Sequence, residues 1–257
     1  MRTGPGRLTG NLLCAAFLLA EAVLFGWIVG TTFSEGSGDK ARMASIVVCA
    51  AFALVRFALT LLKECGRVPR SEDEEAGTGS DTAEEAFLLS AFIFSSAADR
   101  YLIFDPEKTL SAVLIFCVAQ VFHALRIMAA SGMSGGWLLA RAGLLLTGGT
   151  VLAIMKVRDP LIYAGTFYIL NLAVSFARSI GLAGKKRSCL ILPAGLFLFI
   201  LCDITVGIRG MGPSWDLPER LVSVASDLTY IFYVPSQVLI ALSGLEFRRR
   251  EASWKTS

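Results

Sequence analysis

The sequence is poor in the residues on which soluble enzymes most often rely. It contains a single histidine, and charged residues occupy 18% of its 257 positions, against roughly 25% in an average soluble domain. Hydrophobic residues make up 54% of the chain, and the mean hydropathy is +0.63. This composition excludes a water-soluble globular domain and is typical of a protein that lies within a membrane.

The positions of the cysteines and of the basic residues argue against a metal site, a disulfide framework and nucleic-acid binding. The six cysteines form no Cys-x-x-Cys pair and no Cys/His cluster, so neither a zinc site nor a disulfide framework is indicated. The net charge is only +3, and lysines and arginines are scattered along the chain. A nucleic-acid-binding protein would need them gathered into a basic stripe. We therefore expect no nucleic-acid partner, no metal and no organic cofactor.

Apolar runs long enough to cross a membrane recur along the whole sequence. A transmembrane helix needs about 20 mostly apolar residues, and such runs lie at residues 11–31, 42–63, 85–104, 109–130, 134–155, 159–181, 188–208 and 220–245. One longer connector, from Ser71 to Glu85, combines acidic residues with Gly and Ser and predicts a mobile loop. The sequence thus predicts an all-α fold: one transmembrane domain over residues 1–257, a polytopic bundle of about eight transmembrane helices.

The distribution of lysine and arginine predicts how this bundle is oriented. Basic residues accumulate in the cytoplasmic connectors of membrane proteins. Counted over alternating connectors, fourteen lie on the side of the two termini and eight on the other side. We therefore expect both termini in the cytoplasm and the protein in the cell membrane.

Several ionisable residues fall inside the predicted spans, where a charge costs at least ~2.5 kcal/mol and needs a partner. They are Glu21, Arg56, Asp99, Arg141, Asp203 and Asp227. Counting about 1.5 Å per residue along neighbouring helices places Glu21 and Arg56 at similar depth. The pattern predicts an ion pair between these two residues that joins the first two spans.

Asp99 and Asp203 lie about fourteen and fifteen residues into two spans that run in the same direction, so their carboxyl groups should share one layer. Single polar residues in membrane helices usually bind neighbouring helices. A cluster drawn from five helices instead favours a functional cavity. The other polar residues expected within a few turns of this layer are Gln120, His123, Asn171, Tyr233, Ser236 and Gln237.

Three stretches around these residues carry a more specific signal. They are residues 95–102, which read Ser-Ser-Ala-Ala-Asp-Arg-Tyr-Leu, residues 195–203, Gly-Leu-Phe-Leu-Phe-Ile-Leu-Cys-Asp, and residues 233–243, Tyr-Val-Pro-Ser-Gln-Val-Leu-Ile-Ala-Leu-Ser. Together with Pro160, Tyr163 and the number of spans, they resemble the YhhN lysoplasmalogenase family. Where that family has Phe-x-x-x-His-x-x-Tyr, this chain has Phe-x-x-x-Gln-x-x-His at residues 116–123.

The resemblance implies an enzyme that cleaves the vinyl ether of a lysoplasmalogen, a membrane lysophospholipid, into a fatty aldehyde and a glycerophospho headgroup. Such a reaction needs an acid that protonates the enol ether and an anion that stabilises the resulting cation, as in paired-carboxylate glycosidases. Asp99 and Asp203 are the implied pair. His123 either orients the attacking water or replaces the family's histidine from one turn further along the same helix. The implied substrate-binding residues are Gln120, Asn171, Tyr163, Tyr233 and Gln237.

Two alternatives stay open at the level of the sequence. Either aspartate fits the role of acid, although an inward-turned Arg100 would keep Asp99 ionised and leave Asp203 as the donor. Eight helices with a polar middle layer would also suit a lipid or solute carrier that performs no chemistry, or an assembly protein whose polar residues only join helices.

Overall fold

The computed structural model describes residues 5–32, 39–65, 78–131, 135–185, 190–211 and 216–254. Within these ranges the chain forms eight long α-helices and one short 3₁₀ turn, all of the long helices apolar enough to cross a membrane. The predicted all-α membrane bundle is thereby confirmed. Its elements are α1 (Pro5–Thr32), α2 (Asp39–Glu64), α3 (Thr78–Phe104), η2 (Pro106–Lys108), α4 (Thr109–Ser131), α5 (Gly135–Ile154), α6 (Pro160–Lys185), α7 (Ile191–Met211) and α8 (Glu219–Trp254).

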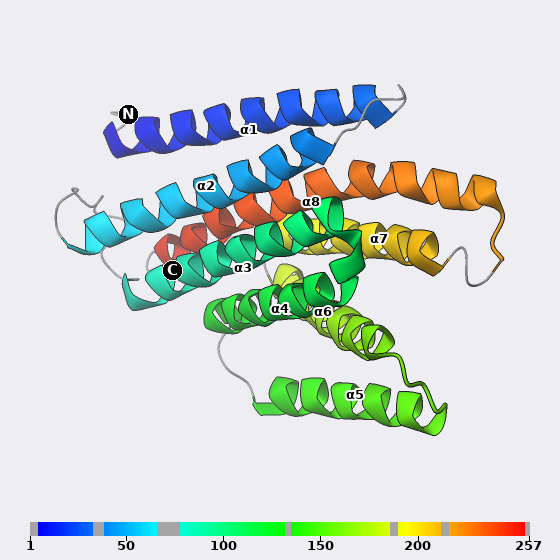
Figure 1. Cartoon of the computed structure of the whole chain (residues 1–257). Coiled ribbons are helices and arrows are strands. Elements are labelled where there is room, and N and C mark those ends of the chain that lie inside the picture. Colours follow the sequence, from blue (N-terminus) through cyan, green and yellow to red (C-terminus); the bar gives the residue numbers. More distant parts are fainter. Residues whose placement is uncertain are drawn as a thin grey trace.

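Successive helices run antiparallel, so α1 begins and α8 ends at the same end of the bundle (Figure 1). The opposite end carries the turn at Asp105 and the starts of α2, α4, α6 and α8, and we call it the Asp105 end. α1 and α5 lie at the two edges, with the other helices packed between them (Figure 1). Which end faces the cytoplasm stays a prediction.

Small residues allow α3 and α4 to pack closely. Ala91 and Ala98 on α3, and Ala112 and Ala119 on α4, are each at most 1% exposed. A spacing of seven residues puts both members of each pair on one helix face. In a membrane such small-residue faces let two backbones approach and gain dispersion contacts, because burial of apolar surface gives little advantage over lipid.

A glycine has the same function between α7 and α8. A Cβ atom at Gly195 would lie 3.0 Å from Cγ1 of Ile240 and 3.1 Å from its backbone nitrogen. This contact is tighter than ordinary side-chain packing, so a larger residue at position 195 would force the two helices apart. The close approach of α7 to α8 therefore depends on a residue without a side chain.

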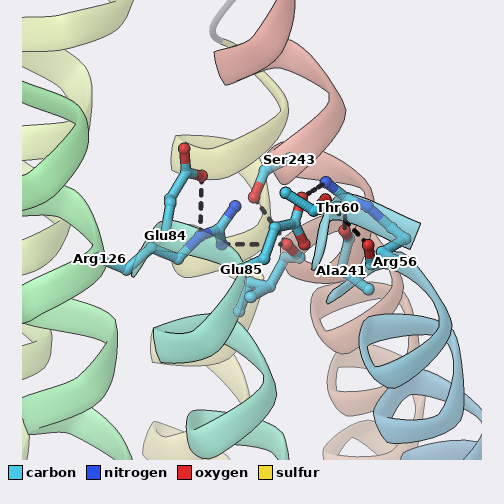
Figure 2. Close-up of polar contacts among 8 residues, drawn as sticks. Arg56, Thr60, Glu84, Glu85, Arg126, Ala241 and Ser243 are labelled. Carbon is cyan, nitrogen blue, oxygen red and sulfur yellow. Dashed lines mark hydrogen bonds and ion pairs between the residues drawn. The ribbon is translucent and has the colours of Figure 1, made fainter. Parts of the chain in front are cut away.

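Two buried arginine–glutamate pairs join α2, α3, α4 and α8 (Figure 2). The helix bounds place them toward the end of the bundle opposite Asp105. Arg56 on α2 pairs with Glu85 on α3, and its Nη1 donates to the carbonyl oxygen of Ala241 on α8 at 3.0 Å. Arg126 on α4 pairs with Glu84 at 3.3 Å. All four side chains are less than 10% exposed, so their charges are compensated within the protein rather than by solvent.

The second arginine also reaches α8. Nη1 of Arg126 donates to the carbonyl oxygen of Ile240 at 3.3 Å, one residue before the carbonyl that Arg56 contacts. The two guanidinium groups approach α8 from different helices, α2 and α4 (Figure 2). They therefore fix both the rotation and the depth of α8 relative to α3.

These pairs correct two sequence-based expectations. The segment from Ser71 to Glu85 was expected to be a mobile loop, but α3 begins at Thr78 and the loop's last two glutamates are buried partners of arginines. Residues 71–77 lie outside the described ranges. The third span was predicted to start at residue 85 because the acidic residues at this point lower the local hydropathy. Hydropathy does not show that arginines of neighbouring helices neutralise Glu84 and Glu85.

The expected ion pair between Glu21 and Arg56 is wrong. The Glu21 carboxylate accepts hydrogen bonds from the hydroxyl of Ser45 at 2.6 Å and the thiol of Cys49 at 3.5 Å, while Arg56 pairs with Glu85. Cys49 and Arg56 are seven residues apart, which is about 10 Å along α2. The depth estimate failed because α1 and α2 are displaced along their axes by about two turns relative to their hydropathy boundaries.

The helix α5 is held at the edge of the bundle mainly by α6. None of its residues is buried. Its intramembrane arginine, Arg141, donates from Nη2 to the hydroxyl of Ser175 at 2.8 Å and to the backbone carbonyl of Asn171 at 3.3 Å. The remaining surface of α5 is apolar and suited to contact with lipid, as expected for a peripheral transmembrane helix.

We predict that Arg126→Met lowers the free energy of unfolding in detergent by about 3–5 kcal/mol, because it removes the ion-pair partner of the buried Glu84 carboxylate. Thermal or chemical unfolding measures the change. The double variant Arg126→Met/Glu84→Leu should recover part of this loss, since both charges are then gone while the hydrogen bond to the Ile240 carbonyl remains absent. Arg100→Met, which removes an exposed arginine from α3, is the matched control and should stay near wild type. A stability loss of similar size in the control would contradict the prediction.

Candidate active site

Asp99 lies on α3 in a buried position, 2% exposed, nearer to the Asp105 end than to the arginine–glutamate pairs. The hydroxyl of Tyr233 on α8 donates to its Oδ2. This contact joins α3 and α8 in the interior of the bundle. It also orients the carboxyl group, since one of its two oxygens is occupied by the phenol.

Asp203 lies on α7 and is held in a similar way by a second tyrosine. The hydroxyl of Tyr168 on α6 donates to Oδ2 of Asp203 at 2.8 Å. The ring of Phe199, one turn before Asp203, contacts the rings of Tyr168 and Tyr233, with centroid distances of 6.5 and 6.1 Å. The two aspartates lie near enough to interact electrostatically. The structure thus brings Asp99, Asp203 and Tyr233 into one layer.

A buried arginine distinguishes the two carboxyl groups. Arg42, near the start of α2, is 6% exposed and interacts electrostatically with Asp99. Its guanidinium carbon lies 4.4 Å from the ring centroid of Tyr230 and 5.6 Å from that of Tyr233, within the range of cation–π attraction. Among the described residues, the groups that act on Asp203 are Tyr168 and Asp99. Only Asp99 therefore has a cation beside it.

The arginine that faces Asp99 is not the one that the sequence suggested. Arg100 was considered as the partner because it follows Asp99 directly, but its side chain is exposed. Neighbouring residues on a helix point about 100° apart, so they seldom face the same group. Arg42 was counted as a residue of a connector because the apolar run starts there.

Three buried polar side chains, Ser95, Gln120 and Gln237, lie at about one depth between the aspartates and the arginine–glutamate pairs. We call them the amide layer. The Tyr233–Asp99 contact places Gln237 level with Ser95, and the Phe92–His123 ring contact places Gln120 there too, because α3 is antiparallel to both α8 and α4. Ser95 is four residues from Asp99, about 6 Å along α3.

The amide layer is not satisfied by protein groups alone. Ser95 Oγ, both polar atoms of Gln120 and Oε1 of Gln237 have no hydrogen-bond partner, although each residue is at most 1% exposed. Buried polar atoms in this state cost about 1–3 kcal/mol each. They are rare in native proteins unless water or a ligand supplies the missing bonds.

The other predicted site residues lie further from the carboxyl groups. His123 is buried with its edge against Phe92 and an unpartnered Nε2, and Phe92 is seven residues, about 10 Å, from Asp99 along α3. Asn171 donates to the carbonyl of Phe167 within its own helix at 2.8 Å. Tyr163 lines a groove between α4 and α6 near the Asp105 end.

Two residues of the site escaped the sequence-based interpretation. Arg42 was hidden by its position at the edge of an apolar run. Tyr168 was overlooked because the predicted spans, 159–181 and 188–208, put it nine residues from one boundary and Asp203 only five residues from the other. The helix ends in the structure bring the two depths into agreement. Tyr168 is eight residues from the start of α6 at Pro160, and Asp203 is eight residues from the end of α7 at Met211.

These features define a class of protein: an eight-span membrane bundle with two interior carboxyl groups, each held by a tyrosine. Within the described ranges no three His, Cys, Asp or Glu side chains gather as the ligands of a metal ion would. A family model described as the YhhN family matches residues 48–244, and the chain belongs to this family. Comparisons with curated proteins and with solved structures gave no match. Arg42 lies outside the matched residues.

We predict that Gln120→Leu raises the free energy of unfolding in detergent by about 1–3 kcal/mol, since it removes a buried amide without protein partners. Thermal unfolding measures the shift. Thr229→Val is the contrasting variant, because the Thr229 hydroxyl is hydrogen-bonded to Thr205 at 2.9 Å, and it should lower stability by about 1 kcal/mol. A destabilised Gln120→Leu would show that the amide has a structural function.

Proposed function

We propose that the protein hydrolyses the vinyl ether bond of lysoplasmalogens, releasing a fatty aldehyde and a glycerophospho headgroup, by acid catalysis from a pair of aspartates. The observation that carries this proposal is the asymmetric pair: two interior carboxyl groups in one layer, of which only Asp99 has an arginine beside it. Membership of the YhhN family supports the same reaction class.

The asymmetry suggests one role for each carboxyl group. A neighbouring cation stabilises the charged form of a carboxyl group, and two nearby carboxyl groups do not readily both ionise. Arg42 therefore suits Asp99 to the anionic role and leaves Asp203 to carry the proton. This division matches the requirement for one acid and one anion in the cleavage of an acetal-like bond.

The reaction then proceeds in two steps. Asp203 transfers its proton to the β carbon of the enol ether, the vinyl carbon that is not bonded to oxygen. The positive charge that forms on the carbon bearing the oxygen is stabilised by the Asp99 carboxylate. Water adds to that carbon and returns a proton to Asp203. The resulting hemiacetal separates into the aldehyde and the hydroxyl of the glycerophospho headgroup, so the acid is regenerated without any further reactant.

The remaining polar residues have supporting roles in this scheme. Tyr168 and Tyr233 hold the two carboxyl groups in orientation. The amide layer, one turn from Asp99, offers unpartnered donors and acceptors for the attacking water or for glycerol hydroxyls. Its unsatisfied atoms fit a hydrolase, which must admit water into an otherwise apolar interior.

We predict that Asp203→Asn lowers the rate of aldehyde release from a lysoplasmalogen by roughly 10²- to 10⁴-fold, the usual effect of removing a general acid. The amide is nearly isosteric with the acid and can still accept from Tyr168, so the melting temperature should change little. Mass spectrometry of the aldehyde and of the headgroup product, with purified protein in detergent, measures the rate.

Asp227→Asn is the matched control for this experiment. Asp227 is a half-buried aspartate on α8 with no hydrogen bond or ion pair to a described residue, and its variant should retain wild-type turnover. Undiminished aldehyde release by the Asp203 variant would reject the acid role. Absence of turnover in the wild-type protein, with lipid binding retained, would favour the alternative of a lipid-binding or transport protein.

The role of Arg42 yields a separate prediction. Arg42→Gln should lower kcat roughly 10²-fold, as expected when one charge that supports the transition state is lost. KM should change less than kcat, because the guanidinium acts on Asp99 rather than on the lipid. Steady-state kinetics separate these effects, with the exposed Arg220→Gln as the control on the same end of the bundle. A larger effect on KM than on kcat would instead make Arg42 a substrate-binding residue.

A further inference from the structure

A groove of about 540 Å³ runs between α4 and α6 at the Asp105 end of the bundle. Its lining is mostly apolar, and its volume falls in the usual range of about 300–1,000 Å³ for small-ligand sites. Both helices belong to the membrane-spanning part of the chain, so the groove lies beside the hydrocarbon region of the membrane. The residues that matter here are Leu110, Leu114, Cys117, Arg158, Tyr163 and Phe167.

The groove and the candidate active site are formed by neighbouring residues of α4 and α6. Phe167 and Cys117 line the groove, and the residues next to them in sequence, Tyr168 and Phe116, face each other with ring centroids 5.9 Å apart. Tyr168 donates to Asp203 on its other side. A molecule in the groove would therefore contact the residues next to Phe116 and Tyr168 in sequence, on the two helices that bring this aromatic pair together.

Among the described residues that line the groove, one is charged. Arg158 lies in the connector between α5 and α6, just before α6 begins at Pro160, and its side chain is exposed. It makes no hydrogen bond or ion pair with a residue in the described ranges. One oxygen of the adjacent Asp159 carboxylate, Oδ1, accepts from the backbone N–H of Leu161 at 2.8 Å, which turns this oxygen toward the start of α6. The arginine is therefore available to an anion at the mouth of the groove.

We propose that this groove binds the hydrocarbon chain of a single-chain phospholipid, with the phosphate held by Arg158. The inference rests on the proposed function and assigns a binding site to the substrate of the proposed reaction. An apolar groove beside lipid fits the chain, and an unpaired guanidinium at its open end complements a phosphate group. The hydroxyl of Tyr163, three residues into α6, is available to the glycerol part of the same molecule.

The groove can be tested without turnover by a non-cleavable probe: a 1-O-alkyl lysophospholipid with a photoreactive diazirine in its chain. The full-length protein in detergent is irradiated with this probe, and labelled peptides are identified by mass spectrometry. We expect labelling on α4 and α6 around Leu114 and Phe167. Arg158→Gln should raise the dissociation constant about tenfold, the effect of losing one charge-assisted contact.

Two controls separate phosphate recognition from a general loss of binding. Arg220→Gln removes another exposed arginine near the start of α8 and should leave binding of the probe unchanged. A phosphate-free 1-O-alkylglycerol with the same chain should bind wild type and Arg158→Gln equally.

A further variant tests the site of the hydrocarbon chain. Leu114→Trp, at a side chain that is 51% exposed, should fill the groove and weaken both probes without disturbing the core.

Labels spread evenly over the lipid-facing helices, or an Arg158→Gln variant with wild-type affinity, would overturn the groove assignment. These outcomes are distinguishable from failure of the proposed reaction. Groove labelling that depends on Arg158, together with no aldehyde from a true lysoplasmalogen, supports the groove and rejects the hydrolase. Aldehyde release with labels elsewhere supports the hydrolase and rejects the groove.

Discussion

The position of α8 depends on two guanidinium groups that donate to consecutive backbone carbonyls. In hydrocarbon a buried charge needs a partner within the protein, and Arg56 and Arg126 each find a glutamate on α3 and a carbonyl oxygen on α8. Tyr233 is seven residues before Ile240, about 10 Å along the helix. Its contact with Asp99 therefore follows from the register that the arginines impose.

Along the bundle, the buried polar groups differ in how completely they find hydrogen-bond or ion-pair partners within the protein. The arginine–glutamate pairs neutralise each other, and the aspartates are each bound by a tyrosine. Between them the amide layer keeps several donors and acceptors without protein partners. A bundle that needed polar groups only to join its helices would not retain such atoms at the cost of stability. These atoms lie one turn from Asp99, so we infer that the stability is given up for the function of the two carboxyl groups.

Much of the fold could be predicted from the sequence, because membrane helices are recognised by length and hydropathy alone. Asp99 and Asp203 could also be found, since carboxyl groups within apolar runs are conspicuous. The partners of these groups could not, because they depend on helix rotation and axial displacement. Glu21 illustrates the failure: a shift of two turns between α1 and α2 gives it Ser45 and Cys49 instead of Arg56. Charges at span edges, such as Arg42 and Glu85, were misplaced because hydropathy averages cannot recognise compensation between helices.

Gly195 has an effect that reaches beyond its own contact. Ile240 is enclosed from two directions, with its carbonyl oxygen accepting from Arg126 and its side chain and backbone nitrogen against the bare backbone of α7. Asp203 is eight residues further along α7, about 12 Å away. A methyl group at position 195 would require α8 or α7 to move by a few tenths of an ångström, and any shift of α7 would also move Asp203 relative to Asp99. The distance between the two aspartates thus depends in part on the absence of a side chain at Gly195, about three turns away along α7.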